Sequence, residues 1–345
     1  MSGGVDSSVA AGLLVEAGHE VVGATLKLWG GAMDSGCCSV SDVDDARRVA
    51  QILGIDHHVF NYTEEFERHV VAPFVSAHAQ GRTPNPCIEC NRHIKFDLLF
   101  ERARRLGFDA VATGHHARVA TRDGRRYVAR GADKKKDQSY VLGYLDASAL
   151  AMLELPIGDF TKDQVRHHAK RLGLRTWNKP DSQDVCFIEA SRGREAFLRE
   201  RINVTPARIV DVASGEDLGA VEVAELVTVG QRRGVAPGRD GEKRYVTRVD
   251  LERRRVEVGR LADVLVDEIR LEADSISFAH EAIRDGERVL AQWSAHGAVN
   301  EVVYHDAPAR LELERGVRPV AAGQSAVFFR LDEPSLVVGA GVVAP

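Results

Sequence analysis

The chain has 345 residues, of which 44% are hydrophobic and 28% charged, and its formal net charge is −5. These values are ordinary for a globular protein of two or three domains, and no apolar run approaches the roughly 18 residues of a membrane span. No signal-peptide pattern is present, so we expect a cytoplasmic protein with no membrane partner. Five cysteines, an odd number with one Cys-x-x-Cys, exclude a disulfide scaffold and fit a reducing compartment with redox or metal chemistry.

The charges are unevenly distributed along the chain. Residues 81–208 contain 25 Lys and Arg against 16 Asp and Glu, so the acidic excess lies in the remainder. The overall negative charge excludes a uniformly basic nucleic-acid binder. A basic middle region within an acidic chain is nevertheless what a phosphate-backbone partner requires, although solvated helix faces would give the same count.

The chain begins with Ser-Gly-Gly-Val-Asp-Ser-Ser at residues 2–8, and an apolar run typical of a helix follows. Glycines allow a tight turn close to a ligand, and the start of a helix offers N–H groups to phosphate. The Gly-Lys-Ser/Thr ending of a Walker loop is missing, which disfavours transfer of a γ-phosphate. A helix capped by serine after a glycine turn is the alternative. An apolar strand normally precedes such a loop, and we expect that strand to be missing here.

Strand and helix patterns alternate after this loop. A near-continuous apolar run at 19–28 predicts a buried parallel strand, and the rhythm that follows predicts an α/β doubly wound parallel sheet for a domain spanning 1–200. Prolines at positions 84 and 86 predict a rigid loop suited to holding reactive groups still. The further predicted elements are helices at 44–54, 64–80 and 90–106 and strands at 57–61 and 110–113.

The second half of the chain becomes rich in strand patterns. Residues 118–130 predict a hairpin around Asp123-Gly124, and Thr161 with Gln164 predicts a capping box for a helix reaching Leu172. Short β-branched runs separated by glycine turns then predict a small β-rich central domain over 201–262, with strands at 207–212, 224–229 and 244–250. Alternating strands over 263–345 predict a C-terminal β-barrel.

Several motifs in order carry a resemblance to a known family. They are Ser2-Gly-Gly-Val-Asp-Ser-Ser8, Gly81-Arg-Thr-Pro-Asn-Pro86, Cys90-Asn91, Ile94-Lys-Phe96, Ala112-Thr-Gly-His-His-Ala-Arg118, Asp137-Gln-Ser-Tyr140 and Lys179-Pro-Asp-Ser182 with Cys186-Phe-Ile188. The first resembles the loop of PP-loop ATP pyrophosphatases, and the set resembles the tRNA-specific 2-thiouridylases up to about residue 259. The resemblance implies that ATP with Mg²⁺ adenylates O2 of the wobble uridine of tRNA, and that sulfur then replaces this oxygen.

The resemblance also implies roles for individual residues. The residues expected to bind ATP are Ser2, Gly3, Gly4, Val5, Asp6, Ser7, Ser8, Leu26 and Gly114, with Asp6 holding Mg²⁺ or orienting the pyrophosphate. The residues expected to contact tRNA are Asn85 and Pro86, at the target base, and Lys136, Asp137 and Gln138. Asp181 and Ser182 are expected to shape the same site, and residues 231–234 to lie near the tRNA.

The cysteines leave two interpretations of the sulfur chemistry open. The resemblance implies that Cys90 is the nucleophile and that Cys186 carries a persulfide, with a disulfide between them as one outcome. Cys87 departs from the aspartate of the best-described branch, and Cys87, Cys90 and Cys186 together are the thiolate set of a [4Fe-4S] cluster with one open iron. Both interpretations require a sulfur-donor protein such as a cysteine desulfurase or a relay. Another PP-loop sulfurtransferase and an inactive tRNA-binding relic remain the alternatives.

Overall fold

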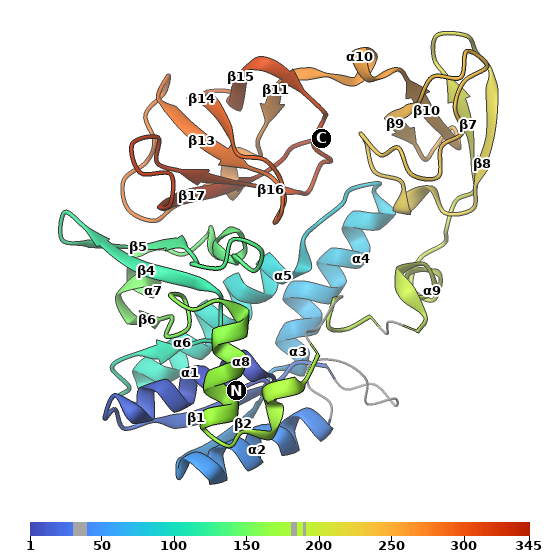
Figure 1. Ribbon diagram of the computed structural model, residues 1–345. Coiled ribbons are helices and arrows are strands. Elements are labelled where there is room, and N and C mark those ends of the chain that lie inside the picture. The colour runs from blue at the N-terminus through green and yellow to red at the C-terminus, as the bar shows by residue number, and fades with distance from the viewer. Residues whose placement is uncertain (30–39, 181–184, 189–190) are drawn as a thin grey trace.

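The computed structural model describes residues 1–29, 40–180, 185–188 and 191–345 (Figure 1). The N-terminal unit is mixed α/β, which confirms the predicted class. Its parallel strands form two pairs in the described residues, and not one continuous sheet. The pairs are β1 (Val22–Lys27) with β2 (Asp56–Asn61), and β3 (Val111–Ala112) with β6 (Leu153–Glu154). Helix α1 (Val5–Glu16) packs against both α2 (Val40–Leu53) and α8 (Lys162–Arg171) in this unit.

Two long helical runs cross the unit, and both contain a π-helical segment. The first consists of α3 (Thr63–Phe66), η1 (Glu67–Val71) and α4 (Ala72–Ala79), and the second of α5 (Pro86–Glu89), η2 (Cys90–Leu98) and α6 (Leu99–Arg105). The second run begins at Pro86, four residues before the predicted start, because Asn85 caps it through the N–H of Cys87. Such π segments are frequent at functional sites.

The remaining elements of this unit are short. The predicted hairpin is confirmed as β4 (Ala117–Arg122) and β5 (Arg125–Arg130), with positive φ at Asp123 and Gly124 in its turn. The predicted capping box is confirmed at the start of α8. The other elements are η3 (Ser139–Leu142), α7 (Ala147–Met152), η4 (Arg175–Asn178) and α9 (Gly193–Arg199).

The central region is a four-stranded sheet in the order β8-β7-β10-β9. Its elements are β7 (Ala207–Asp211), β8 (Asp217–Val221), η5 (Ala224–Leu226), β9 (Tyr245–Asp250) and β10 (Arg255–Gly259). The predicted strand at 224–229 was wrong, since the segment starts as the 3-10 turn η5. Its cause is the buried Glu225, whose carboxylate accepts the N–H of Thr205 and thereby turns the chain inward.

The C-terminal region is a seven-stranded antiparallel sheet in the order β11-β15-β14-β13-β16-β17-β12. An antiparallel bridge from Leu271 to Val343 joins the ends of β11 and β17 and curls the sheet toward a barrel. The elements are α10 (Leu261–Val264), β11 (Val266–Arg270), η6 (Ala273–Ser275), β12 (Ser277–Phe278), β13 (Arg288–Gln292), β14 (Asn300–Asp306), β15 (Ala309–Val317), β16 (Ser325–Phe329) and β17 (Val337–Val342). The domain limits of 1–200, 201–262 and 263–345 stay predictions.

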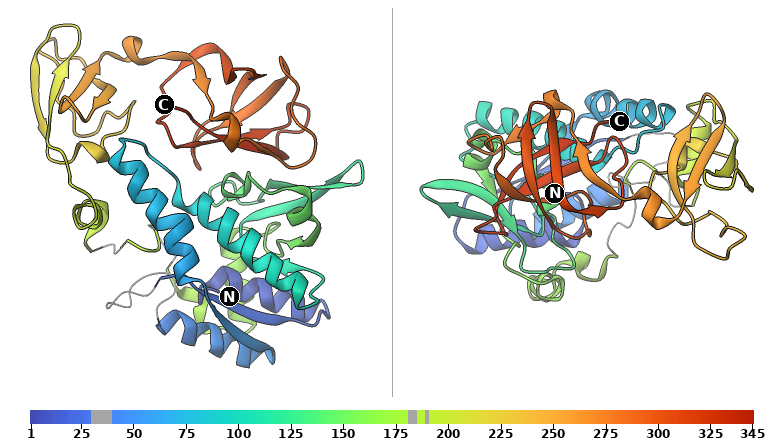
Figure 2. Two further views of the ribbon diagram at one scale, coloured as in Figure 1. Left: turned by 180° about the vertical axis from the view of Figure 1, so that it is seen from behind. Right: turned by 90° about the horizontal axis from the view of Figure 1, so that it is seen from above.

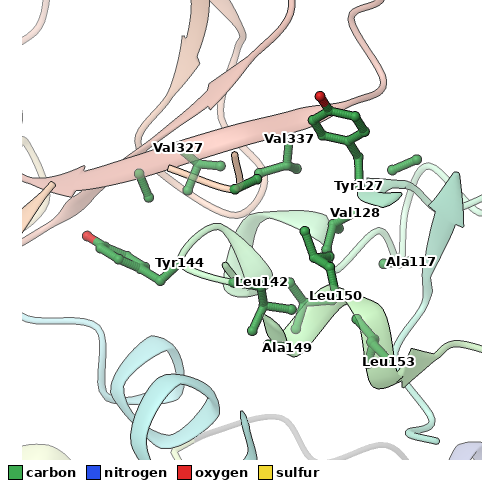
Figure 3. Packing of buried hydrophobic residues seen from close by; sticks show 14 of the residues in the cluster. Ala117, Tyr127, Val128, Leu142, Tyr144, Ala149, Leu150, Leu153, Val327 and Val337 are labelled. Atoms are coloured by element: carbon green, nitrogen blue, oxygen red, sulfur yellow. The ribbon is translucent and has the colours of Figure 1, made fainter. Parts of the chain in front are cut away.

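The barrel rests on the hairpin side of the N-terminal unit, and the central sheet lies to one side near the end of α4 (Figures 1 and 2). One buried apolar cluster spans the contact and contains Leu142 and Tyr144 of the N-terminal unit together with Val327 and Val337 of the barrel (Figure 3). In the described part of the chain, no helix combines the length and apolar character that a membrane crossing requires.

Candidate active site

The glycine turn leads directly into α1, as the sequence predicts. Gly3 has a φ of +71°, and a Cβ there would lie 2.3 Å from the carbonyl oxygen of Asp42. Gly4 occupies the N-cap position without a side-chain cap, while the hydroxyls of Ser7 and Ser8 donate back to its carbonyl at 3.3 and 2.7 Å. The alternative of a serine cap for this helix is therefore wrong. No side chain caps the start of α1, and the N–H groups at a helix start can bind an anion.

Gly114, which follows β3, packs against the same helix end. A Cβ at Gly114 would lie 2.5 Å from the backbone nitrogen of Ser7, so only glycine fits without displacing α1. Ser2 also contacts this turn, because its N–H and hydroxyl lie 3.0 and 3.1 Å from the hydroxyl oxygen of Ser7. The structure thus brings Ser2–Ser8 and Gly114 together, as the sequence predicts. Their role in binding ATP stays a prediction.

Asp6, in the first turn of α1, is held by Lys162 and His116. The ammonium of Lys162 lies 2.8 and 2.7 Å from its two carboxylate oxygens, and Nε2 of His116 lies 3.2 Å from one of them. Burial raises the pKa of Asp6, but hydrogen bonds from His116 and Lys162, together with the charge of Lys162, outweigh it, so this pKa falls below its ordinary 3.8. Asp6 is therefore a carboxylate at neutral pH.

A second lysine holds the glycine turn from the other side. The ammonium of Lys179 donates to the carbonyl of Gly3 at 3.0 Å and pairs with the carboxylates of Asp42 and Asp45 at 2.6 and 2.7 Å. Partial burial lowers the pKa of Lys179, but the two aspartates outweigh it, so the pKa rises above 10.5. The turn therefore lies among fixed charges of both signs, which suits a metal-nucleotide.

Cys90 and Cys186 belong to one apolar cluster. Cys90 is buried at the start of η2, and half-buried Cys186 packs against the same group of residues. Leu26 of β1, the residue expected near the adenine, packs against this cluster as well. Phe66, Phe74 and Phe187 form its aromatic centre through edge-on contacts. The structure therefore places both expected sulfur-handling residues and Leu26 around one core.

Cys87 differs from Cys90 in exposure. Cys87 is exposed, whereas Cys90, one helical turn later, is buried. Among the described residues, no group of three or more His, Cys, Asp or Glu side chains could hold a metal ion. The arrangement of Cys87, Cys90 and Cys186 in this structure therefore does not fit a three-thiolate cluster site. Cys37 and Cys38 lie outside the described residues.

The expected tRNA-contacting residues have defined internal positions. Asn85 caps α5 and Pro86 is buried at its first position. The carboxylate of Asp137 accepts hydrogen bonds from Arg130, Gly131 and Ser139.

Gln138 Oε1 accepts the N–H of His116 at 2.8 Å and so supports the loop that reaches Asp6. Lys136 is half-buried, whereas its neighbours Lys134 and Lys135 are exposed. Asp181 and Ser182 lie outside the described residues.

Sequence analysis missed the functional positions of three residues, namely His116, Lys162 and Lys179. His116 and Lys179 lay inside quoted motifs, and Lys162 lay inside the predicted capping box. A lone lysine or histidine carries no local signal for an ion pair formed across more than 100 residues. A basic residue at a helix start, where the dipole disfavours positive charge, was the one available hint for Lys162.

Comparisons with known proteins identify the family of the chain. The family model described as tRNA methyl transferase HUP domain matches residues 1–190, and that described as tRNA methyl transferase PRC-barrel domain matches 195–260. A protein of Corynebacterium aurimucosum named tRNA-specific 2-thiouridylase MnmA is 43% identical over 99% of this chain and 97% of its own.

Proteins of the same name from Mycobacterium ulcerans and Saccharopolyspora erythraea are 45% and 42% identical, covering 96% and 100% of this chain and 92% and 98% of their own. The solved NMN synthetase of Francisella tularensis is 21% identical over 52% of this chain and 63% of its own, with a TM-score of 0.35, which is too low to carry an argument. The chain belongs to the tRNA-specific 2-thiouridylase family.

Proposed function

We propose that this protein catalyses the ATP-dependent 2-thiolation of the wobble uridine of tRNA, in the cytoplasm. The observation that supports this most is the shared cluster of Leu26, Cys90 and Cys186, on a unit that also presents the glycine turn and Asp6. An enzyme that activates a carbonyl with a nucleotide and then replaces its oxygen by sulfur needs those two functions side by side. Membership of the tRNA-specific 2-thiouridylase family supports the same function.

In the activation step, O2 of the uridine attacks the α-phosphorus of ATP and pyrophosphate leaves. The N–H groups at the start of α1 bind the phosphates, and Lys162 keeps Asp6 ionised and oriented toward them. Mg²⁺ would neutralise phosphate charge, with Asp6 as the carboxylate best placed to meet it. O2 then leaves with AMP when sulfur adds at C2.

In the sulfur step, Cys186 carries a persulfide that a sulfur-donor protein, such as a cysteine desulfurase or a relay, has loaded. The thiolate of Cys90 attacks the inner sulfur of this persulfide, the S–S bond breaks, and the outer sulfur leaves as sulfide. Sulfide adds to C2 and AMP departs. The resulting Cys90–Cys186 disulfide is returned to two thiols by an external dithiol reductant, which supplies two electrons.

We propose the persulfide route over an iron–sulfur cluster, because no group of three or more His, Cys, Asp or Glu side chains among the described residues could hold a metal ion. For the tRNA, we assign the 81–86 loop to the target base and the lysines at 134–136 to backbone phosphates. Asp137 and Gln138 would act there indirectly, by fixing the loop that bears the lysines.

The test uses unmodified tRNA carrying a wobble uridine, Mg-ATP, and a desulfurase with cysteine as the sulfur source. Wild-type protein should release pyrophosphate and form 2-thiouridine, measured by nucleoside mass spectrometry. Cys90→Ser and Cys186→Ser should each keep pyrophosphate release and lose 2-thiouridine, while Cys87→Ser keeps most of both. Absence of 2-thiouridine with the wild type, or full activity of Cys186→Ser, would contradict the proposal. If the wild type contained bound iron and Cys87→Ser lost both this iron and its thiolation activity, the iron–sulfur cluster would be favoured instead.

A further inference from the structure

The loop that leads into the cysteine-bearing helix is bonded to the C-terminal barrel on both sides of one residue. The N–H of Thr83 donates to the carbonyl of Ala322 at 2.8 Å, and the carbonyl of Thr83 accepts the side-chain N–H of Gln324 at 2.6 Å. Both backbone groups of Thr83 are therefore satisfied by the barrel, although it lies more than 200 residues away in the chain. Because the contact uses both main-chain groups of Thr83, it belongs to the backbone hydrogen bonding of the fold.

Gln324 is itself fixed within the barrel. Its N–H donates to the carbonyl of Ala321 at 3.1 Å, and its carbonyl accepts the N–H of Val343 at 2.7 Å. Its neighbour Gly323 has a φ of +88°, and a Cβ added to Gly323 would lie 3.4 Å from the backbone of Thr83 and Pro84. The side chain of Gln324 therefore extends from an anchored backbone onto the loop.

The path from Thr83 to the reactive sulfurs is short and stiff. Pro84 and Pro86 restrict the backbone between Thr83 and α5. The side chain of Asn85 then accepts the N–H of Cys87 at 3.1 Å, which fixes the start of the helix that continues to Cys90. A displacement of Thr83 thus has few soft torsions to absorb it before it reaches Cys90.

Other contacts converge on the same loop. Arg82 pairs with Glu272, which follows β11, and the hydroxyls of Thr83 and Thr228 lie 3.4 Å apart. Leu251 of the central region lies 3.5 Å from where a Cβ on Gly81 would be. Residues of the central region and of the barrel therefore both contact this loop of the N-terminal unit (Figures 1 and 2).

We propose that Gln324 is a positioning residue for sulfur transfer: it holds the 81–86 loop so that Cys90 stays aligned with the activated uridine. This inference rests on the proposed function and adds to it. The barrel then has a role beyond any contact with tRNA, because it completes the scaffold of the cysteine loop. Catalysis is sensitive to such alignment, since a displacement of about 1 Å can cost roughly 100-fold in rate.

The experiment compares Gln324→Ala and Gln324→Glu with His280→Ala in the full-length protein. Gln324→Glu keeps the size of the side chain but replaces its donor with a charged acceptor facing the Thr83 carbonyl. His280 is the matched control, because its Nε2 also bonds a main-chain carbonyl across the barrel contact, that of Arg126 at 2.8 Å, on the hairpin and far along the chain from the loop. Thermal melts establish that each variant is folded.

Two measurements are made on each variant. The first is the rate at which iodoacetamide alkylates Cys90, followed by peptide mass spectrometry without ATP or tRNA. The second is the turnover rate of tRNA thiolation, determined together with the KM for ATP and the rate of pyrophosphate release. In both Gln324 variants, iodoacetamide should alkylate Cys90 about fivefold faster than in the wild type, because a factor of about five corresponds to the loss of one hydrogen bond. The turnover rate of thiolation should fall by at least the same factor. Their KM for ATP should stay at the wild-type value.

Wild-type alkylation and wild-type thiolation turnover in Gln324→Glu would overturn the proposal. So would an equal effect in His280→Ala, which would show a general response to loosening of the barrel. If the wild type forms no 2-thiouridine, the proposed function fails, whereas the alkylation rates still decide whether Gln324 holds the cysteine loop. The two failures are therefore distinguishable.

Discussion

Gly114 shows how a single missing side chain shapes the site. Its Cα lies against the first turn of α1, where a Cβ would come within 2.5 Å of the Ser7 nitrogen and 2.6 Å of the Asp6 carbonyl carbon. Real Cβ atoms do not approach backbone so closely, so α1 or the loop after β3 would have to move. The start of α1, which we propose binds the phosphates, therefore depends on a residue more than 100 positions away.

We predict that Gly114→Ala abolishes activation while leaving most of the protein folded. The added methyl displaces the start of α1, so pyrophosphate release should fall at least about 100-fold, the cost of roughly a 1 Å misplacement. The matched control is Gly18→Ala, which changes the glycine that follows the other end of α1. That position has a φ of +84° with nothing within 4 Å, so the cost should be about 1 kcal/mol of stability with normal turnover. Equal pyrophosphate release by Gly114→Ala and wild type would contradict the prediction.

At this scale the sequence predicted the loop residues but not their charged neighbours. The glycines and serines of residues 2–8 form a local motif that predicts a phosphate-binding turn, and its resemblance to a PP loop implies ATP. Lys162 and Lys179 reach the same turn from other segments of the chain, and their roles exist only after those segments pack. The exposure of Cys87 could not be predicted from the sequence either, because Cys87 belongs to the same Cys-x-x-Cys motif as buried Cys90.

At the scale of elements, the pair of Asp6 and Lys162 joins the first turn of α1 to the first residue of α8. The Lys162 side chain is about nine-tenths buried, and its backbone N–H donates to the carboxylate of Asp133 at 2.9 Å. An ammonium so little exposed needs its carboxylate partner, since removal of one member of a buried pair is strongly destabilising. The ion pair therefore fixes how the two helices meet at the site.

We predict that the stabilising effect of Asp6 depends on pH with a defined sign. The pKa of Asp6 is lower in the folded protein than its ordinary 3.8, so the unfolded chain binds the extra proton. Its contribution is therefore fully present above pH 3.8 and is lost as the pH falls through the folded-state pKa. The variant Asp6→Asn lacks this pH-dependent contribution to the free energy of unfolding. The difference in melting temperature between wild type and Asp6→Asn should be largest at neutral pH and shrink below pH 3.8.

Thermal melts over that range, at low salt, measure the difference. Glu16→Gln is a suitable control, since Glu16 pairs with Arg171 across the same two helices but on the exposed surface. An exposed pair should change the melting temperature little at any pH. A constant difference between wild type and Asp6→Asn at all pH values would contradict the assignment.

Elements with a local signal were predictable, and elements defined by tertiary contacts were not. The hairpin at 118–130 and the capping box at Thr161 follow from turn and cap chemistry, and both are confirmed. The π-helical geometry from Cys90 to Leu98 has no comparable pattern in the sequence. The turn at 224–226 replaced a predicted strand because the carboxylate of buried Glu225 accepts a hydrogen bond from the N–H of Thr205.

For the whole molecule, the contact between the barrel and the N-terminal unit is a continuous apolar core (Figure 3). Tyr140 and Tyr144 add hydrogen bonds from their hydroxyls to the backbone and side chain of Ser325, at 2.8 and 3.1 Å. Burial raises the pKa of Tyr140 above its usual range, so both its ring and its neutral hydroxyl belong to the folded core. The sequence predicted the barrel but contained no sign of the face on which it packs.

We predict that Gly143 and Val327 are energetically coupled across this contact. A Cβ on Gly143 would lie 2.8 and 2.9 Å from the two methyl carbons of Val327. Gly143→Ala alone should therefore overpack the contact and cost about 1–3 kcal/mol. Val327→Ala alone should leave a cavity and cost about 2 kcal/mol. In the double variant the new methyl occupies the space that the valine vacates, so the total should fall below the sum by about 1 kcal/mol or more.

Urea unfolding of the four proteins of this cycle measures the coupling. Val256→Ala, at a fully buried valine of the central sheet, serves as the control partner for Gly143→Ala, because residues without shared neighbours should add within about 0.5 kcal/mol. Strict additivity of Gly143→Ala with Val327→Ala would mean that the barrel does not pack on residue 143 in solution. The cysteine loop would then lose the support that depends on the barrel, since Gln324 lies only three residues before Val327 on the same edge of the contact.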